Sequence, residues 1–174
     1  DETYVRLERL AFETMARQQP VATDLRFLVA ITRLLYEIER SGDLVVNAAN
    51  GLLRQNGYEL SPEVRSRLAR ISSEVTDVWS RSIDVLDEMN GDAAEWIDRL
   101  DDEVDDLVGE FYTIIGASSD EMGFEVAVEL SRVGRYLERI ADHAVNIAEH
   151  VAFIVTGAFP EDSLPPHPAP EDEA

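Results

Sequence analysis

The chain has 174 residues, no cysteine and a formal net charge of −21, from 36 Asp and Glu against 15 basic residues that are all Arg. This length suits one sizeable domain or two small packed repeats. The absence of cysteine excludes disulfides, zinc fingers and thiolate chemistry. The acidic surface repels phosphate backbones and anionic headgroups, so we expect no binding to nucleic acid. No stretch reaches about 18 apolar residues, so we expect no insertion into a membrane.

The first half of the chain predicts two helices that are separated by a proline break. Apolar residues recur at helical spacing through residues 1–18, and Pro20 ends this segment because proline has no N–H to donate. A longer helix follows over about residues 23–54. Its expected N-cap is Thr23 and its expected exit is Gly57.

The second half predicts three helices and a tail. A helix begins at Ser61 and runs to Met89, because a Ser cap followed by proline is a typical helix start. Helices over about residues 93–115 and 124–155 follow, with a polar connector between them. Residues 160–174 are rich in proline and acidic side chains, so we expect them to be disordered.

The two long helices carry one short pattern at the same place. The pattern Glu-Arg-x-small-Asp-x-x-x-Asn-x-Ala begins at Glu39 and again 99 residues later at Glu138. Such a period is typical of an internal duplication. We therefore interpret the chain as all-α, with three-helix bundles repeated in tandem over residues 1–57 and 58–159. The first bundle lacks its first helix in this chain.

The repeated pattern brings like charges together. Glu and Asp four residues apart lie one above the other on a helix, with Cβ atoms roughly 6 Å apart. The Arg after the Glu points about 100° away, so we do not expect it to neutralise the pair. Carboxylates from a neighbouring helix would complete an oxygen site for a hard cation. Antiparallel packing would place Asp101 and Asp105 beside Glu138 and Asp142.

The first repeat offers fewer carboxylates. Asp1 corresponds to Asp101, but Val5 stands where a counterpart of Asp105 is expected. From spacing alone, two interpretations stay open. The Asp and Asn side chains either contribute to a metal site or cap and cross-link helices.

We find no catalytic arrangement in the sequence and expect no enzymatic activity. Di-iron oxidases need Glu-x-x-His on a helix, and Gly42 and Ala141 stand at the two histidine positions. No nucleophile–base pair and no glycine-rich phosphate loop is found. The three histidines are expected at the surface or at the edge of the core: His143, His150 and His167.

Three segments carry a resemblance to a known family: Gln19-Pro20-Val21-Ala22-Thr23-Asp24-Leu25-Arg26, Glu39-Arg40-Ser41-Gly42-Asp43 and Glu138-Arg139-Ile140-Ala141-Asp142. Together they resemble the PhoU family, the phosphate-signalling accessory proteins of bacteria, over about residues 1–159. The resemblance implies bound metal, with iron or zinc expected and manganese or magnesium as alternatives. The metal ligands that it implies are Glu39, Asp43, Asp101, Asp105, Glu138, Asp142 and Asp1, with Asn47 and Asn146 one turn further on.

The resemblance also implies partners. Members of the family act with the phosphate ABC transporter, through its ATPase subunit, and with a sensor histidine kinase. We therefore expect a cytoplasmic negative regulator of phosphate uptake and of phosphate-starvation signalling, which forms a homodimer through the apolar face that the first bundle leaves open. The alternatives are an accessory domain of another transporter, a carboxylate-bundle metalloprotein and a helical scaffold without metal.

Overall fold

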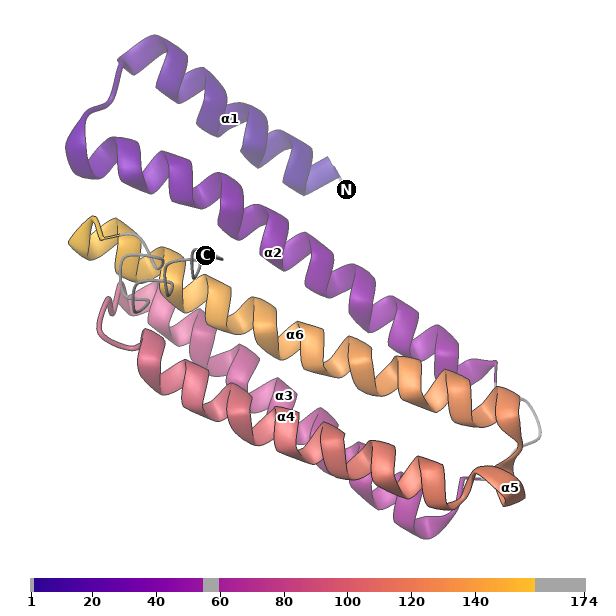
Figure 1. Cartoon of the computed structure of the whole chain (residues 1–174). Coiled ribbons are helices and arrows are strands. Elements are labelled where there is room, and N and C mark those ends of the chain that lie inside the picture. The colour runs from indigo at the N-terminus through magenta and orange to yellow at the C-terminus, as the bar shows by residue number, and fades with distance from the viewer. Residues whose placement is uncertain (1, 55–59, 159–174) are drawn as a thin grey trace, which may run out of the picture.

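The computed structural model describes residues 2–54 and 60–158, which form an all-α fold (Figure 1). The helices are α1 Glu2–Gln18, α2 Ala22–Leu53, α3 Pro62–Glu88, α4 Ala94–Ala117, α5 Ser119–Met122 and α6 Phe124–Thr156. Their order confirms the prediction, and the four-residue α5 lies in the expected connector. Four predictions fall outside the described residues: the ligand Asp1, the helix exit at Gly57, His167 and the tail at 160–174.

Helix α6 lies at the centre of the fold. It packs against α2 on one side and against α3 and α4 on the other, and α1 lies along α2 (Figure 1). The two helices that carry the duplicated pattern, α2 and α6, therefore lie side by side. Within residues 2–54 and 60–158, no helix is both long and apolar enough to cross a membrane.

The hydrophobic core crosses from one repeat into the other. Leu44 and Ala48 of α2 belong to the same buried cluster as the core residues of α3, α4 and α6. A smaller cluster joins Ala30 and Leu34 of α2 to the C-terminal half of α6. Helix α2 therefore buries its apolar face against α6, and the proposed division into residues 1–57 and 58–159 describes a duplication within one continuous core.

The predicted cap of α3 is confirmed and that of α2 is wrong. Ser61 Oγ accepts a hydrogen bond from the backbone N–H of Val64, 3.3 Å away, at the start of α3. Helix α2 begins at Ala22, after Val21 in an extended conformation and without a side-chain cap. Thr23 lies inside the helix, where its hydroxyl accepts a hydrogen bond from Arg26 at 3.1 Å.

Arg26 joins the start of α2 to the end of α6. Its Nε donates a hydrogen bond to the carbonyl oxygen of Ile154, 3.3 Å away in the last turn of α6. Gly157 ends that helix with a φ of 80°, and a Cβ atom there would lie 3.2 Å from Nη1 of Arg26. A guanidinium at a helix C-terminus satisfies a free carbonyl and opposes the helix dipole.

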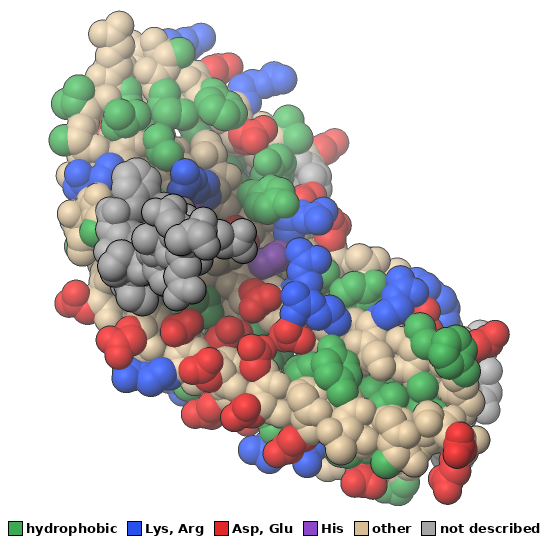
Figure 2. Space-filling model, in the orientation of Figure 1, with side chains coloured by type: hydrophobic (Ala, Val, Ile, Leu, Met, Phe, Trp, Pro, Cys, Tyr) green, Lys and Arg blue, Asp and Glu red, His purple; other side chains and the backbone are tan. Residues whose placement is uncertain are grey.

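The exposed surface is divided by chemistry. Hydrophobic side chains gather over α1 at one end of the face in Figure 2, whereas acidic side chains gather around α4. The exposed apolar residues of α1 include Val5, Leu10 and Phe12, each more than half exposed.

Candidate metal centre

Helices α4 and α6 bring together the four carboxylates predicted for the second repeat. The two helices run antiparallel (Figure 1), so that the N-terminal half of α4 meets the middle of α6. The charge of Asp142 acts on Asp101 and Asp105, and the charge of Asp105 acts on Glu138. We call Asp101, Asp105, Glu138 and Asp142 the carboxylate cluster.

Asp101 is the most perturbed member of the carboxylate cluster. Burial, followed by the negative charges of Asp105 and Asp142, raises its pKa to about 7. Its Oδ1 atom is buried and has no hydrogen-bond partner within the described part of the chain. Burial is also the largest cause that raises the pKa of Asp105 and of Glu138. The protein therefore holds several carboxylates where their charged forms are disfavoured.

Arg135 supplies positive charge to the cluster. It lies one turn before Glu138 on α6 and forms an ion pair with it. Its charge lowers the pKa of Glu138 and of Asp105, in opposition to burial. This partial neutralisation does not prevent the net rise in the pKa of either carboxyl.

The donor atoms of the cluster suit a hard cation, because carboxylate oxygens are the ligands that such ions prefer. The buried Oδ1 of Asp101 is free to become one of them. As the side chains are arranged here, however, no three Asp, Glu or His residues in the described ranges are grouped closely enough to hold one metal ion. The cluster thus fits a cation in its chemistry, and binding requires carboxylate side chains to rotate toward one another.

The first repeat does not gather an equivalent cluster from its described residues. Asp43 is exposed, and one of its oxygens lies 3.9 Å from Nη1 of Arg40. The expectation that this Arg would not neutralise the pattern is wrong for Asp43, because the long Arg side chain reaches the carboxylate three residues further on. Glu39 is partly buried and faces α1.

The α1 groups opposite Glu39 are Tyr4 and Glu8. The hydroxyl of Tyr4 donates to Oε1 of Glu8 at 2.9 Å. That hydrogen bond is the largest cause that raises the pKa of Tyr4, and the charge of Glu39 adds to it. Because Glu8 already accepts a hydrogen bond from Tyr4, we expect this group to attract a cation less strongly than Asp101, whose Oδ1 has no partner among the described residues.

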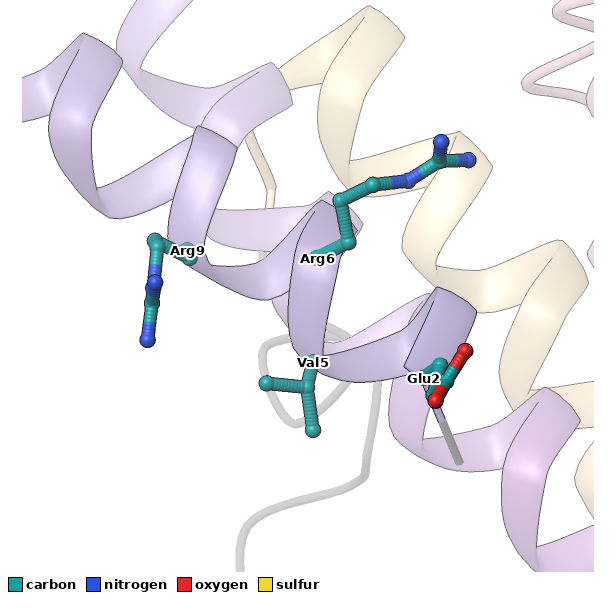
Figure 3. Close-up of a pocket in the computed structure, with 4 residues that line it drawn as sticks. All are labelled: Glu2, Val5, Arg6 and Arg9. Carbon is teal, nitrogen blue, oxygen red and sulfur yellow. The ribbon is translucent and has the colours of Figure 1, made fainter.

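Val5, which replaces an acidic position, is about half exposed. Together with Glu2, Arg6 and Arg9 it lines a shallow hollow on α1 (Figure 3). Two guanidinium groups against one carboxylate make this hollow unsuitable for a cation. The expectation that the first repeat is the poorer site stays a prediction.

The two Asn positions of the pattern differ in their surroundings. Asn146 is partly buried and lies one turn after Asp142 on α6, whereas Asn47 is exposed on α2. Only Asn146 is therefore placed near the carboxylate cluster, and a supporting role for either residue stays a prediction.

The sequence analysis missed a buried polar contact between the repeats. His143, expected at the surface or the core edge, is only 8% exposed, and its Nδ1 lies 2.8 Å from Oγ of Ser41. Its Nε2 lies 3.8 Å from Oε2 of Glu37. Burial lowers the pKa of His143, although the charge of Glu37 opposes this effect. A signal was available, because the duplicated position is Leu44, a residue type typical of a core.

His150 lies at the core edge of α6, as predicted. Burial, with a smaller contribution from the charge of Arg33, lowers its pKa to about 4. The imidazole therefore stays neutral at physiological pH.

The sequence matches the family described as "PhoU domain" over residues 1–52 and 68–151. It is 33% identical over 162 residues to "Phosphate-specific transport system accessory protein PhoU homolog 1" of Mycobacterium leprae, which covers 92% of this chain and 73% of that protein. It is 35% identical over 164 residues to the PhoU homolog of Deinococcus radiodurans, which covers 91% and 75% of the two chains.

Two solved structures are similar in fold. The crystal structure of PhoU from Pseudomonas aeruginosa superposes with a TM-score of 0.77 at 27% identity, over 90% of this chain and 78% of that one. The phosphate transport system regulatory protein PhoU from Streptococcus pneumoniae superposes with a TM-score of 0.81 at 21% identity, over 91% and 74%. The duplicated pattern on α2 and α6, the helical fold and these matches together show that the chain belongs to the PhoU family.

Proposed function

We propose that the protein is a negative regulator of phosphate uptake and of phosphate-starvation signalling, which binds cations and acts by contact with other proteins. Its relatives are named as accessory proteins of a phosphate-specific transport system. We place it at the cytoplasmic face of the membrane, in contact with the ATPase subunit of the phosphate ABC transporter and with a sensor histidine kinase.

The observation that carries cation binding is the state of Asp101. A carboxyl whose pKa is raised to about 7, with a buried oxygen that lacks a partner, is stabilised by an approaching positive charge. A bound divalent or trivalent ion would supply that charge and would join α4 to α6. Iron, zinc, manganese and magnesium are the candidate ions.

The chemistry of the site favours binding over catalysis. His143, the imidazole next to the cluster in sequence, is directed to Ser41 and Glu37 of α2. The cluster is therefore built from carboxylates alone, unlike the mixed carboxylate and imidazole sites of di-iron bundle enzymes. We propose a non-enzymatic role on this ground.

Elemental analysis of the purified protein tests cation binding. We expect stoichiometric metal in the wild type and loss of that metal in the double variant Asp101→Asn, Asp142→Asn. The matched control is Asp102→Asn, Asp106→Asn, which removes two exposed carboxylates from α4 and should keep the metal. Equal metal content in both double variants, or a wild type that takes up no metal on titration, would refute the site.

The regulatory role is tested in a bacterial host that lacks its own PhoU protein. Expression of the full-length protein should restore repression of a phosphate-starvation promoter when phosphate is plentiful. Co-purification with the transporter ATPase and the sensor kinase should accompany it. An unchanged promoter despite normal expression would refute the role. Light scattering of the full chain tests the homodimer.

A further inference from the structure

A buried hydrogen bond joins the two copies of the duplicated pattern. Ser41 lies inside the first copy on α2, and His143 directly follows the Asp of the second copy on α6. Ser41 is 3% exposed and His143 is 8% exposed, and Oγ and Nδ1 are 2.8 Å apart. A bond of this length, closed to solvent, links the two helices at one point of their contact.

Glu37 adds a third polar group to this point of contact. It lies one turn before Ser41 on α2, and its Oε2 is 3.8 Å from Nε2 of His143. That oxygen is buried and has no hydrogen-bond partner in residues 2–54 and 60–158. The bond between Ser41 and His143 stabilises one relative placement of the helices, because a shift would leave both groups unpaired beside the Glu37 oxygen that already lacks a partner within these ranges.

The duplication shows that the fold does not require this polar contact. The position equivalent to Ser41 is Ile140, and the position equivalent to His143 is Leu44. Ile140 and Leu44 are both buried in the main hydrophobic cluster. The duplicated positions thus hold an apolar pair, Leu44 and Ile140, and a polar pair, His143 and Ser41. We infer that the polar pair has a role beyond filling the interface.

Helix α6 connects this pair directly to the carboxylate cluster. Asp142 and His143 are neighbours in sequence, and their side chains leave the helix about 100° apart. Asp142 acts on Asp101 and Asp105 of α4, whereas His143 contacts Ser41 of α2. A displacement of this turn of α6 therefore changes both contacts together.

We propose that Ser41 and His143 are a positioning pair that couples the carboxylate cluster between α4 and α6 to helix α2. A change of charge at the cluster moves the central turn of α6, and the buried bond passes this change to α2. The identity of a cation as the natural effector rests on the proposed function, whereas the coupling itself does not.

Hydrogen exchange at the α2 amides around Ser41 tests the coupling in the full chain. The cluster is perturbed in two independent ways, by adding Mn²⁺ and by Asp101→Asn, which removes a charge without any metal. In the wild-type background we expect either change to slow exchange in this part of α2 by roughly five-fold or more. In Ser41→Ala we expect the slowing to be abolished.

Two further variants separate coupling from loss of stability. Ser82→Ala is the matched control, because Ser82 is also fully buried but donates only within its own helix, to the carbonyl oxygen of Trp79. It should keep the full response of α2. His143→Asn, which places a polar atom near the position of Nδ1, should retain most of the response, and the apolar His143→Phe should lose it.

Each outcome decides the proposal. A response of α2 in Ser41→Ala equal to that of the wild type would overturn it, as would a wild type in which neither perturbation reaches α2. A response of α2 to Asp101→Asn, with neither a response to Mn²⁺ nor calorimetric binding of Mn²⁺, would support the coupling and count against cation binding. Calorimetric binding of Mn²⁺ together with no change at α2 on either perturbation would refute the coupling and leave cation binding in place.

Discussion

At the scale of single residues, the carboxylate cluster determines how the protein responds to pH. The folded protein keeps the proton of Asp101 to a pH of about 7, whereas the unfolded chain releases it near the ordinary value of 3.8. The stability from this tighter proton binding is fully present below the unfolded value and is lost as the pH rises through about 7. The protein therefore loses stability at neutral pH, which is also where we propose that the carboxylate cluster binds a cation.

The variant Asp101→Asn should remove this loss, since an amide mimics the protonated acid. We expect it to be more stable than the wild type at pH 8 by about 1–2 kcal/mol, after discounting for solvent screening at a partly buried site. The two stabilities should converge near pH 4. Urea unfolding in the presence of a chelator measures both. Asp102→Asn, an exposed neighbour, is the control, and an equal gain there would contradict the assignment to Asp101.

His150 should change stability with pH in the opposite direction. Its pKa falls to about 4 in the folded protein, so the stability that it contributes is present above the unfolded value and is lost as the pH falls toward 4. In an NMR titration, its ring signal should not shift between about pH 7.5 and about pH 5.5. His150→Gln identifies the signal. A titration midpoint near the ordinary value of 6.5 would show that the imidazole is not buried as described.

At the scale of helices, the contact between Arg26 and the last turn of α6 fixes where two distant segments meet. The segment Gln19-Pro20-Val21-Ala22-Thr23-Asp24-Leu25-Arg26 is one of the three that resemble the PhoU family. Its last residue has a physical role in the fold, because Arg26 donates to the otherwise free carbonyl of Ile154 beside Gly157. The start of α2 therefore stabilises the end of α6.

Replacing Arg26 by Ala should lower the free energy of unfolding by about 1 kcal/mol. The carbonyl oxygen of Ile154 loses its hydrogen-bond donor, and the C-terminus of α6 loses the positive charge that opposes its dipole. Hydrogen exchange should speed up in the last turn of α6 before it does elsewhere. Arg70→Ala removes an exposed Arg from the N-terminal half of α3 and serves as the control. If the two variants fray the end of α6 equally, Arg26 is not its cap.

The sequence predicted the start of a helix well where the capping contact lies within a few residues. Ser61 followed by Pro62 marks a helix start by a contact that spans only three residues, and the structure confirms it. Thr23 carries the same preference, yet the N-cap of α2 is the extended Val21, two residues earlier. A cap preference is weak when the turn before the helix sets the start.

Contacts between distant segments were predictable only where a geometric rule applied. Residues at i and i+4 lie on one face of a helix, and antiparallel packing of α4 on α6 brings two such faces together. These two rules were enough to group Asp101 and Asp105 with Asp142. The contact of Ser41 with His143 depends on how α2 and α6 are rotated about their axes, and helical periodicity does not determine that rotation. The contact of Ser41 with His143 was therefore visible only in the structure, although Leu44 at the position equivalent to His143 indicated a buried site.

At the scale of the whole molecule, charge is distributed unevenly between the repeats. Residues 1–57 carry eight Asp and Glu against seven Arg, whereas residues 58–159 carry 23 against eight. Like charges at this density repel one another and oppose compaction. The acidic excess therefore falls on the half that also holds the carboxylate cluster.

Salt should stabilise the protein, because it screens the repulsion between the acidic side chains. Raising NaCl from about 0.05 M to about 1 M shortens the Debye length to about 3 Å, so the midpoint of urea unfolding should rise. The triple variant Asp102→Asn, Glu103→Gln, Asp106→Asn removes exposed charges from α4 and should show a smaller rise. Identical salt dependence in the variant would mean that salt acts by another route.

The central position of α6 also has a consequence for synthesis on the ribosome. Helix α2 ends at Leu53, but the helix that covers its apolar face is finished only at Thr156, about 100 residues later. At roughly 5–20 residues per second, this face waits roughly 5–20 seconds for its partner while the chain is still growing. The nascent first repeat is thus a natural client for chaperones that shield apolar helices, and the last helix to emerge is the one that releases it.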